Sequence, residues 1–365
     1  MSHNFHPLKI EKIKKETKDA VSIYFDVPSD LQDTFKYTSG QYLTMKLTVN
    51  GEELRRPYSI CTSPVENKLG VNVKRIEGGR VSNYLNDNAA SIETIELMAP
   101  EGRFVVKTSP DYKRDHYFFC AGSGITPIIS MIKTLLEEEP KSCAYLLYGN
   151  KNAESIIFKE ELDQLAEKYQ GQFHKMNILS QPKKEKATGL KGLFGKSVSN
   201  WKGLTGRIDS GSITELLNEY PSKTGNNTFY ICGPGNMIDK TSEILLSKGY
   251  NEDQIKREYF TAADGDNTDT ANATSGAVKV NLEGKVFSVV VPADKTILEA
   301  LIADGVDAPF SCTSGACSTC VAKVNNGKVN MDVCHALDDD EIEDGYILTC
   351  QAHPEGAGVE ITYEA

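Results

Sequence analysis

The chain has 365 residues, of which 25% are charged and 8% aromatic, and at about 100–200 residues per domain this globular composition predicts two or three domains. The most apolar stretch, residues 117–132, is short and broken by glycine and proline, and the first ten residues are polar, so we expect no membrane insertion and a cytoplasmic location. Most of the net charge of −11 lies in residues 278–365, which contain five lysines and fifteen acidic residues. An acidic module of this kind binds nucleic acid poorly and suits docking on a basic protein surface.

Residues 1–111 are predicted to form a β-domain. Four β-rich segments are bounded by turn residues such as Ser39-Gly40 and Asn50-Gly51: residues 20–27, 42–49, 69–73 and 94–98. Short strands at this regular spacing are typical of an antiparallel barrel or sandwich.

Three short motifs of this β-domain suit a flavin nucleotide, and they are Arg56-Pro57-Tyr58-Ser59, Val73-Lys74-Arg75 and Gly79-Arg80-Val81-Ser82. An arginine can hold a pyrophosphate with two hydrogen bonds, a tyrosine offers a flat face to the isoalloxazine ring, and a serine hydroxyl can reach its N5 atom. A glycine and a serine that open a helix present backbone amides to phosphate. Each motif alone would fit a turn or an exposed basic strand, but the three in order favour a flavin site.

Together these motifs resemble the ferredoxin–NADP reductase family. The resemblance implies that Arg56 and Ser82 hold the pyrophosphate, that Tyr58 stacks on the ring and that Ser59 contacts N5 as a catalytic residue. The remaining motif residues, Pro57, Val73, Lys74, Arg75, Gly79 and Val81, complete the expected site. FMN-binding relatives alter the G-x-x-S motif, so the presence of Gly79-Arg80-Val81-Ser82 here favours FAD.

Residues 112–260 are predicted to form a doubly wound α/β domain. Buried strands are expected at residues 117–121, 144–148, 173–179 and 228–232, and helices between them at residues 127–138, 158–169, 212–220 and 236–248. Residues 183–202 carry six lysines and one glutamate, which predicts an inserted surface loop. We interpret it as a solvated insertion; the alternative is a basic dock for the acidic module or for a partner.

Two glycine turns of this domain suit a nicotinamide nucleotide. The run Gly122-Ser123-Gly124-Ile125-Thr126-Pro127 follows a strand and opens a helix, the setting in which a turn holds pyrophosphate, and Pro127 suits a first helical turn. The second turn, Cys232-Gly233-Pro234-Gly235-Asn236-Met237, also joins a strand to a helix. Without the family resemblance Cys232 would be read as a core cysteine, but the family places this residue beside the nicotinamide ring.

The same resemblance suggests roles for residues at the C-terminal end of this domain. The family has an aromatic residue over the flavin face that nicotinamide must reach, for which Phe260 is the candidate and Tyr259 the alternative, and an acidic residue that corresponds to Glu258. An NAD site usually carries an acid about twenty residues beyond the glycines. Here Asn150-Lys151 stands at that strand end, with Ser180 and Arg207 farther along, so NADPH is favoured over NADH.

Residues 261–277 contain no large apolar side chain, which predicts a linker before a third domain at residues 278–365. There Cys312, Cys317 and Cys320 have the spacing C-x4-C-x2-C, and Cys350 follows after twenty-nine residues. This is the plant-type ligand spacing for a [2Fe–2S] cluster, with structural zinc as the alternative. The stretches around these cysteines resemble plant-type ferredoxins, which implies a β-grasp fold and partner docking by the acidic residues 338–344.

The order of flavin, nicotinamide and ferredoxin domains resembles that of oxygenase reductase components, and Gly78–Asp87 resembles the reductase subunits of phenylacetyl-CoA epoxidases. The resemblance implies an NAD(P)H-dependent oxidoreductase that passes electrons through FAD and the cluster to a partner oxygenase. A desaturase or a hybrid-cluster protein is an alternative acceptor. A flavoenzyme with structural zinc and a redox-sensing binding protein are the alternative classes.

Overall fold

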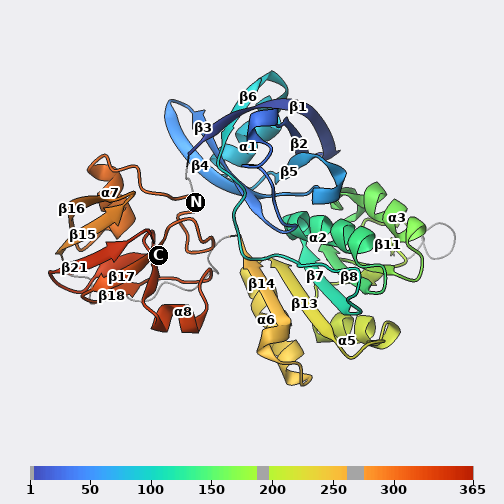
Figure 1. The fold of residues 1–365 in the computed structure, drawn as a ribbon. Coiled ribbons are helices and arrows are strands. Elements are labelled where there is room, and N and C mark those ends of the chain that lie inside the picture. Colours follow the sequence, from blue (N-terminus) through green and yellow to red (C-terminus); the bar gives the residue numbers. More distant parts are fainter. Residues whose placement is uncertain (1–3, 187–196, 261–274, 365) are drawn as a thin grey trace.

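The computed structural model describes residues 4–186, 197–260 and 275–364, which form three modules (Figure 1). The flavin-motif module and the nucleotide-binding module adjoin, and the C-terminal module lies beside both of them. None of the helices in the described ranges has the length and apolar character that a membrane span requires.

The first module is a six-stranded antiparallel sheet with the strand order β4-β3-β6-β1-β2-β5, and a backbone bridge between Ile60 and Val71 closes it toward a barrel. In β3, alternate side chains such as Leu43 and Met45 are fully buried in the barrel core, as the period of a strand requires. The strands are β1 (His6–Thr17), β2 (Ala20–Asp26), β3 (Tyr42–Val49), β4 (Glu52–Ser59), β5 (Leu69–Lys74) and β6 (Thr94–Leu97), with one α-helix, α1 (Arg80–Asn88).

The second module is a parallel sheet with the order β12-β9-β8-β7-β13-β14, which confirms the doubly wound α/β prediction. The chain moves from β7 outward to one side and then returns to place β13 on the other side, and ligands bind at such a switch point. The strands are β7 (Asp115–Ala121), β8 (Cys143–Asn150), β9 (Phe173–Leu179), β12 (Leu204–Thr205), β13 (Asn227–Gly233) and β14 (Ile255–Tyr259). The helices are α2 (Ile125–Glu138), α3 (Lys159–Lys168), α5 (Ser210–Glu219) and α6 (Gly235–Ser247).

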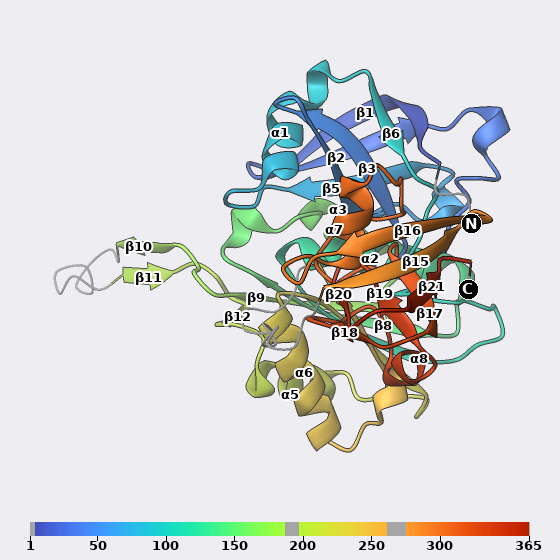
Figure 2. The ribbon, with the colours of Figure 1, turned by 90° about the vertical axis from the view of Figure 1, so that its left-hand side faces the viewer.

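The lysine-rich segment contains a hairpin rather than only a surface loop. Strands β10 (Lys184–Lys186) and β11 (Ser197–Ser199) pair in antiparallel register and project away from the sheet (Figure 2). The returning chain is anchored by Trp201, whose ring packs against the core while its Nε1 donates to the Leu204 carbonyl at 2.8 Å. Because tryptophan buries a large apolar ring, this anchor fixes where the hairpin rejoins β12.

The third module is a mixed sheet, β16-β15-β21-β17-β19, with β15 and β21 parallel at its centre. Strands β15 and β16 form a hairpin, in which Glu283 and Gly284 of the turn both adopt positive φ. The elements are β15 (Gly276–Leu282), β16 (Lys285–Val291), α7 (Ile297–Ala303), β17 (Val321–Asn326), β18 (Val329–Met331), α8 (Asp339–Glu343), β19 (Tyr346–Leu348), β20 (Ala352–Pro354) and β21 (Val359–Thr362). Since β15 begins at Gly276, the end of the expected linker is part of a strand, and residues 261–274 lie outside the described residues.

Hydrogen bonds join the third module to the barrel. Thr44 donates from Oγ1 to Ser311 Oγ at 2.9 Å, and the hydroxyls of Tyr42 and Thr319 lie 2.9 Å apart. Arg55 donates to Asp307 at 2.9 Å and covers the Phe310 ring at 4.4 Å. This face of the barrel therefore holds the C-terminal module through both polar and cation–π contacts.

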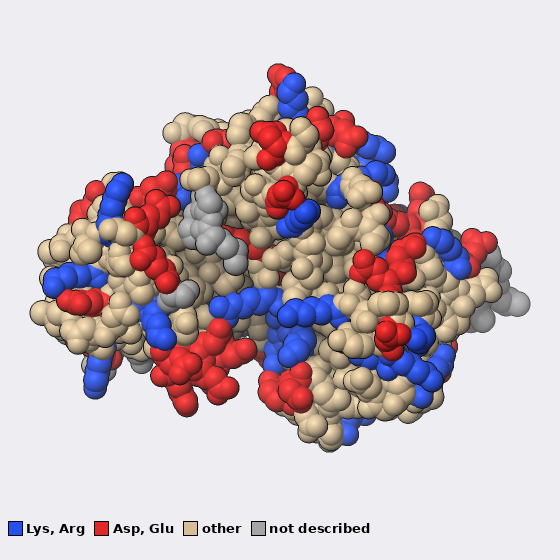
Figure 3. Space-filling view, in the orientation of Figure 1, with Lys and Arg blue, Asp and Glu red and all other residues tan. Residues whose placement is uncertain are grey.

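The C-terminal module also touches the end of the nucleotide-binding module. The rings of Tyr259 and His335 stack at a centroid distance of 4.3 Å. Acidic side chains gather around α8 on the face seen in Figure 3, next to a group of basic side chains in the middle of that face. Near this face, Arg103 of the barrel module forms an ion pair with Glu341 of α8.

Candidate flavin, nicotinamide and cluster site

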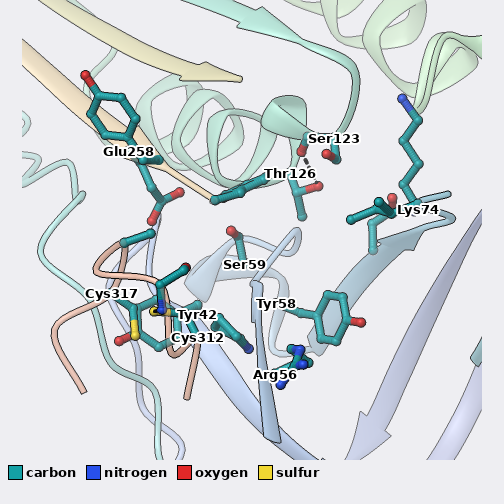
Figure 4. Close-up of a pocket in the computed structure, with 17 residues that line it drawn as sticks. Tyr42, Arg56, Tyr58, Ser59, Lys74, Ser123, Thr126, Glu258, Cys312 and Cys317 are labelled. Atoms are coloured by element: carbon teal, nitrogen blue, oxygen red, sulfur yellow. Dashed lines mark hydrogen bonds between the residues drawn. The ribbon is translucent and has the colours of Figure 1, made fainter. Parts of the chain in front are cut away.

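All three modules line one cavity of about 260 Å³ (Figure 4). Its walls carry residues of the barrel, the first turn of the nucleotide-binding module, the end of β14 and the cysteine loop of the third module. Eleven of the residues singled out in the sequence lie here: Arg56, Pro57, Tyr58, Ser59, Lys74, Thr126, Glu258, Tyr259, Phe260, Cys312 and Cys317.

The flavin wall is built by the end of β4 and by β5. Pairing of β4 with β3 holds Arg56 through Ser59 in extended backbone, and Ser59 is 5% exposed at the cavity edge. Asn72 on β5 also lines the cavity, and its buried Oδ1 has no hydrogen-bond partner among the described residues. A buried acceptor without a partner is costly, so a ligand that donates a hydrogen bond fits here. The arginine, the aromatic ring and the orphan acceptor suit a flavin nucleotide.

The expected pyrophosphate cradle lies at the start of α1. Gly79 precedes this helix and no side chain caps its first amides, which leaves them directed outward as an anion site. Ser82 Oγ accepts a hydrogen bond from the Ile76 amide at 3.3 Å and so shapes the turn. The other predicted residues lie elsewhere: Val73 and Val81 are buried in the barrel core, and Arg75 pairs with Asp87 on the surface.

The two glycine turns of the nucleotide-binding module pack against each other. A Cβ placed on Gly124 would lie 2.1 Å from the Cys232 carbonyl oxygen, so only glycine fits where the ends of β7 and β13 meet. Gly122 has a φ of +57°, and a Cβ on it would lie 2.8 Å from Lys74 Nζ. Burial and the charge of Lys151 lower the pKa of Lys74. A lysine of the barrel thus stands over the phosphate turn. Pro127 lies in the first turn of α2, directly after Thr126.

The cysteine and the carboxyl expected beside nicotinamide lie next to each other. Cys232 is fully buried, and its thiol donates to Glu258 Oε2 at 3.8 Å. Burial raises the pKa of Glu258 to about 8 and also raises that of Cys232. Glu258 lines the cavity, and Cys232 contacts this carboxyl from the buried side. Phe260 and Tyr259 both line the cavity, while Gly233, Pro234 and Met237 form the turn into α6.

The residues expected at the ribose 2′-phosphate lie on one edge of the sheet. Asn150 ends β8, and its carbonyl accepts from the Ser180 amide at 2.9 Å, which places Ser180 beside the strand end. Lys151 follows Asn150 and is exposed, as is Arg207 after β12. Within the described residues, Lys151 and Arg207 make no ion pair. These side chains therefore form a basic edge near the phosphate turn.

The four cysteines with the predicted ligand spacing lie around one loop of the third module. Cys312 and Cys317 line the cavity, whereas Cys320 and Cys350 belong to the module core. Hydrogen bonds from the Cys317 and Cys350 thiols lower the pKa of Cys312 to about 2, and the pKa values of Cys317 and Cys350 are raised. Among the described residues, no three His, Cys, Asp or Glu side chains are arranged around a single metal ion.

The cysteine loop itself is shaped for sulfur contacts. Thr313 and Gly315 adopt positive φ, and the Ser314 amide donates to Cys312 Sγ at 3.4 Å. A Cβ on Gly315 would lie 2.7 Å from the Val333 carbonyl oxygen, so the loop requires glycine there. Two thiols facing the cavity, two in the core and amides turned toward sulfur fit a binuclear cluster better than one ion.

Several cavity residues were not identified from the sequence: Tyr42, Asn72, Ile76, Ser123, Ser314 and Ala316. Tyr42 and Asn72 read as ordinary strand residues, and no local pattern distinguishes them. Ser123 lies inside the glycine turn, and Ser314 and Ala316 lie between the ligand cysteines, so neighbouring motifs could have indicated these three. Cys334, a fifth cysteine of the third module that does not belong to the C-x4-C-x2-C spacing, is half-buried.

Comparison with known proteins gives the same three modules. Residues 7–106 match the oxidoreductase FAD-binding domain family, residues 118–243 the oxidoreductase NAD-binding domain family and residues 280–355 the 2Fe-2S iron-sulfur cluster binding domain family. The chain is 35% identical over 364 residues to one component of the 1,2-phenylacetyl-CoA epoxidase of Escherichia coli (strain K12), a match that covers 99% of this chain and 98% of that protein. It is 33% identical to the ferredoxin reductase component of 3-ketosteroid-9-alpha-monooxygenase of Rhodococcus rhodochrous, over 95% of this chain and 93% of that protein.

The chain belongs to the reductase components of oxygenases. The crystal structure of phthalate dioxygenase reductase shares the fold of this reductase, with a TM-score of 0.58 and 24% identity over 98% of this chain and 97% of that one. An intact type IV self-sufficient cytochrome P450 monooxygenase has a TM-score of 0.66 at 21% identity, over 98% of this chain and 40% of its own. These comparisons confirm the expected fold class, the FAD, the [2Fe–2S] cluster and the pyridine nucleotide, and the cluster family replaces the zinc alternative.

Proposed function

We propose that the reductase takes electrons from NADPH and delivers them through FAD and the cluster to an oxygenase of the phenylacetyl-CoA epoxidase type in the cytoplasm. The observation that supports this route is the shared cavity, in which Tyr58 and Ser59 of the barrel, Phe260 of the nucleotide module and Cys312 and Cys317 of the third module face one space. A donor, a flavin and a one-electron acceptor bound at these walls would stand side by side.

Each wall has a proposed task in this route. Lys74 and the turn at Gly122 bind the dinucleotide phosphates, and the first amides of α1 together with Arg56 bind the flavin pyrophosphate. When bound, FAD would supply the two-electron hydride chemistry and the one-electron release that no side chain of this protein provides. Ser59 orients the ring by a hydrogen bond, Phe260 covers its face until nicotinamide arrives, and Glu258 holds a proton beside that face below about pH 8.

The basic sheet edge supports NADPH rather than NADH. Lys151 and Arg207 are exposed cations, and the Ser180 hydroxyl lies beside them; such groups suit a 2′-phosphate. Replacing Arg207 by alanine should lower kcat/KM for NADPH by about tenfold and leave that for NADH within twofold, since one lost phosphate contact costs about 1.5–3 kcal/mol at most. Equal losses with both nucleotides would contradict this assignment.

The acceptor is tested by reconstitution. The purified reductase, loaded with FAD and cluster, is mixed with the oxygenase components of phenylacetyl-CoA epoxidase or of 3-ketosteroid-9-alpha-monooxygenase, and NADPH-dependent product formation is measured. We expect turnover with the epoxidase at least tenfold faster than with the ketosteroid enzyme. Turnover with neither oxygenase, despite rapid NADPH oxidation with a dye, would exclude this acceptor class.

A further inference from the structure

Thr319 of the cysteine loop is held by the barrel at the point where it contacts a cluster ligand. Its hydroxyl lies 2.9 Å from Tyr42 Oη, 2.9 Å from Glu101 Oε2 and 3.7 Å from Cys317 Sγ. Thr319 is 4% exposed and Tyr42 6% exposed. Tyr42 and Glu101 also exchange two backbone hydrogen bonds, so the two barrel groups are fixed relative to each other.

A threonine hydroxyl has one proton to donate. Thr319 uses it toward the carboxylate of Glu101, a stronger acceptor than a neutral group, while Tyr42 donates to the Thr319 oxygen. A ligating Cys317 is a thiolate and has no proton, so a bond between these two residues would need the same Thr319 proton. While the module is docked, the barrel therefore withholds the Thr319 proton from Cys317.

We propose that docking on the barrel lowers the reduction potential of the cluster and that, in return, reduction of the cluster weakens docking. Hydrogen bonds to cluster sulfurs stabilise the extra negative charge of the reduced state, and a nearby carboxylate destabilises it. Docking removes such a bond and brings Glu101 close, and both effects act in the same direction. The inference rests on the electron route proposed above.

The balance of the step is simple. One electron leaves the bound flavin and enters the cluster, and no proton is transferred because Thr319 only reorients its hydroxyl when Glu101 is gone. Linkage ties the change in docking affinity to the change in reduction potential. For a one-electron couple, if docking is tenfold weaker in the reduced state, the reduction potential of the docked cluster is about 59 mV lower than that of the undocked cluster. The module would thus be released preferentially with its electron.

The C-terminal module must leave the barrel before it can reduce an external acceptor, because its docked position covers the face that carries Cys312 and Cys317. Cys312 and Cys317 face the cavity under the barrel, and Thr44, Arg55 and Arg103 contact the rim of the same face. An external acceptor that approaches these two ligands must replace the barrel. A docking strength that falls on reduction would open this face when the cluster carries an electron.

The first test is a redox titration of the cluster followed by electron paramagnetic resonance. We expect Glu101→Gln to raise the midpoint potential, because it removes the charge and its amide can donate to Thr319, which frees the Thr319 proton for Cys317. Glu11→Gln, which removes an exposed carboxylate on β1 that has no hydrogen bond or ion pair to another module within the described residues, serves as the matched control and should leave the potential unchanged. Equal potentials for wild type and Glu101→Gln would overturn the proposal.

The second test needs no variant. Hydrogen exchange of the backbone amides in β3 and in the cysteine loop is compared in the fully loaded wild-type protein, oxidised and anaerobically reduced. We expect exchange at the interface to be at least threefold faster after reduction, and equal rates would overturn the inference. If the oxygenase assay shows no turnover but the potential and the exchange rates change as expected, the proposed acceptor is wrong and the docking inference stands. If turnover is normal but neither the potential nor the exchange rates change, the docking inference is wrong and the proposed acceptor stands.

Discussion

At the scale of single residues, the site separates groups that meet the cofactors from groups that support them. Glu258 reaches the cavity and is backed by the buried Cys232 thiol. Arg56 faces the cavity, whereas Arg75 is occupied by Asp87. Residue type within a motif therefore does not by itself decide which side chain contacts a ligand; the strand face on which it lies does.

The raised pKa of Glu258 leads to a pH dependence. The carboxyl is neutral below about pH 8 and ionised above it, and a negative charge beside the flavin opposes the arrival of hydride. We expect the rate of FAD reduction by NADPH, measured by stopped flow, to fall as the pH rises through about 8 and to stay level in Glu258→Gln. Between pH 4.5 and 8 the folded protein also keeps a proton that the unfolded chain releases, so this group stabilises the fold less as the pH rises. A falling profile in Glu258→Gln would assign the titration to another group.

The proposed cluster ligands give a second prediction at this scale. Cys317→Ser should abolish the visible spectrum of the [2Fe–2S] cluster and lower cytochrome c reduction by at least a hundredfold, while FAD reduction by NADPH stays within threefold. The matched control is Cys334→Ser, a half-buried cysteine of the same module that is not in the ligand set. A normal cluster spectrum in Cys317→Ser would remove this residue from the ligands.

At the scale of elements, the sequence predicted the strands and helices with turn residues at their ends. The predicted segment 42–49 coincides with β3, and residues 173–179 coincide with β9. Strands β1 and β4 were missed because half of the residues in their sequences, HPLKIEKIKKET and EELRRPYS, are charged and because neither shows clear alternation. Both are stabilised by pairing with neighbours that are distant in sequence or across a turn, which no local pattern reports.

The packing of the glycine turns predicts a specific sensitivity. Gly124→Ala places a methyl group 2.1 Å from the Cys232 carbonyl oxygen, and a backbone atom cannot give way cheaply. We expect a loss of about 1–3 kcal/mol of stability and a lower Tm by several degrees in differential scanning calorimetry, with a higher KM for NADPH. Gly211→Ala in α5, where the nearest atom would be 3.4 Å away, should neither lower the Tm nor raise the KM for NADPH, because alanine favours a helix at least as well as glycine does. An unaltered Tm in Gly124→Ala would contradict this packing.

At the scale of the whole molecule, the order of the modules was predictable and their junction was not. The motifs at residues 56–59, 122–127 and 312–320 identify each module separately. A contact that brings them together, the hydrogen bond from Arg55 to Asp307, joins two residues that belong to none of these motifs. Side chains on two folded surfaces decide such contacts, so the shared cavity and its wall at Tyr42 appear only in three dimensions.

The junction can be weakened without touching the flavin. Arg55→Ala removes the bond to Asp307 and the contact with Phe310, interactions that together are worth about 1 kcal/mol at a partly exposed site. We expect the rate of electron transfer from FAD to the cluster, measured by stopped flow, to fall about fivefold, while the rate of FAD reduction by NADPH is unchanged. Lys141→Ala, which removes a surface pair with Asp111, is the control. An unchanged internal rate would show that this contact does not position the module.

Strand β4 presents Arg55 to the C-terminal module and the next residue, Arg56, to the flavin cavity. Successive side chains of a strand point to opposite faces, so one backbone register sets both contacts at once. Inserting or deleting a single residue in the turn at Asn50-Gly51 would exchange the two arginines. The hairpin can therefore change in length only by two residues at a time if both arginines are to keep their contacts. A chimera that joins a foreign ferredoxin module to this barrel would have to keep β4 unchanged.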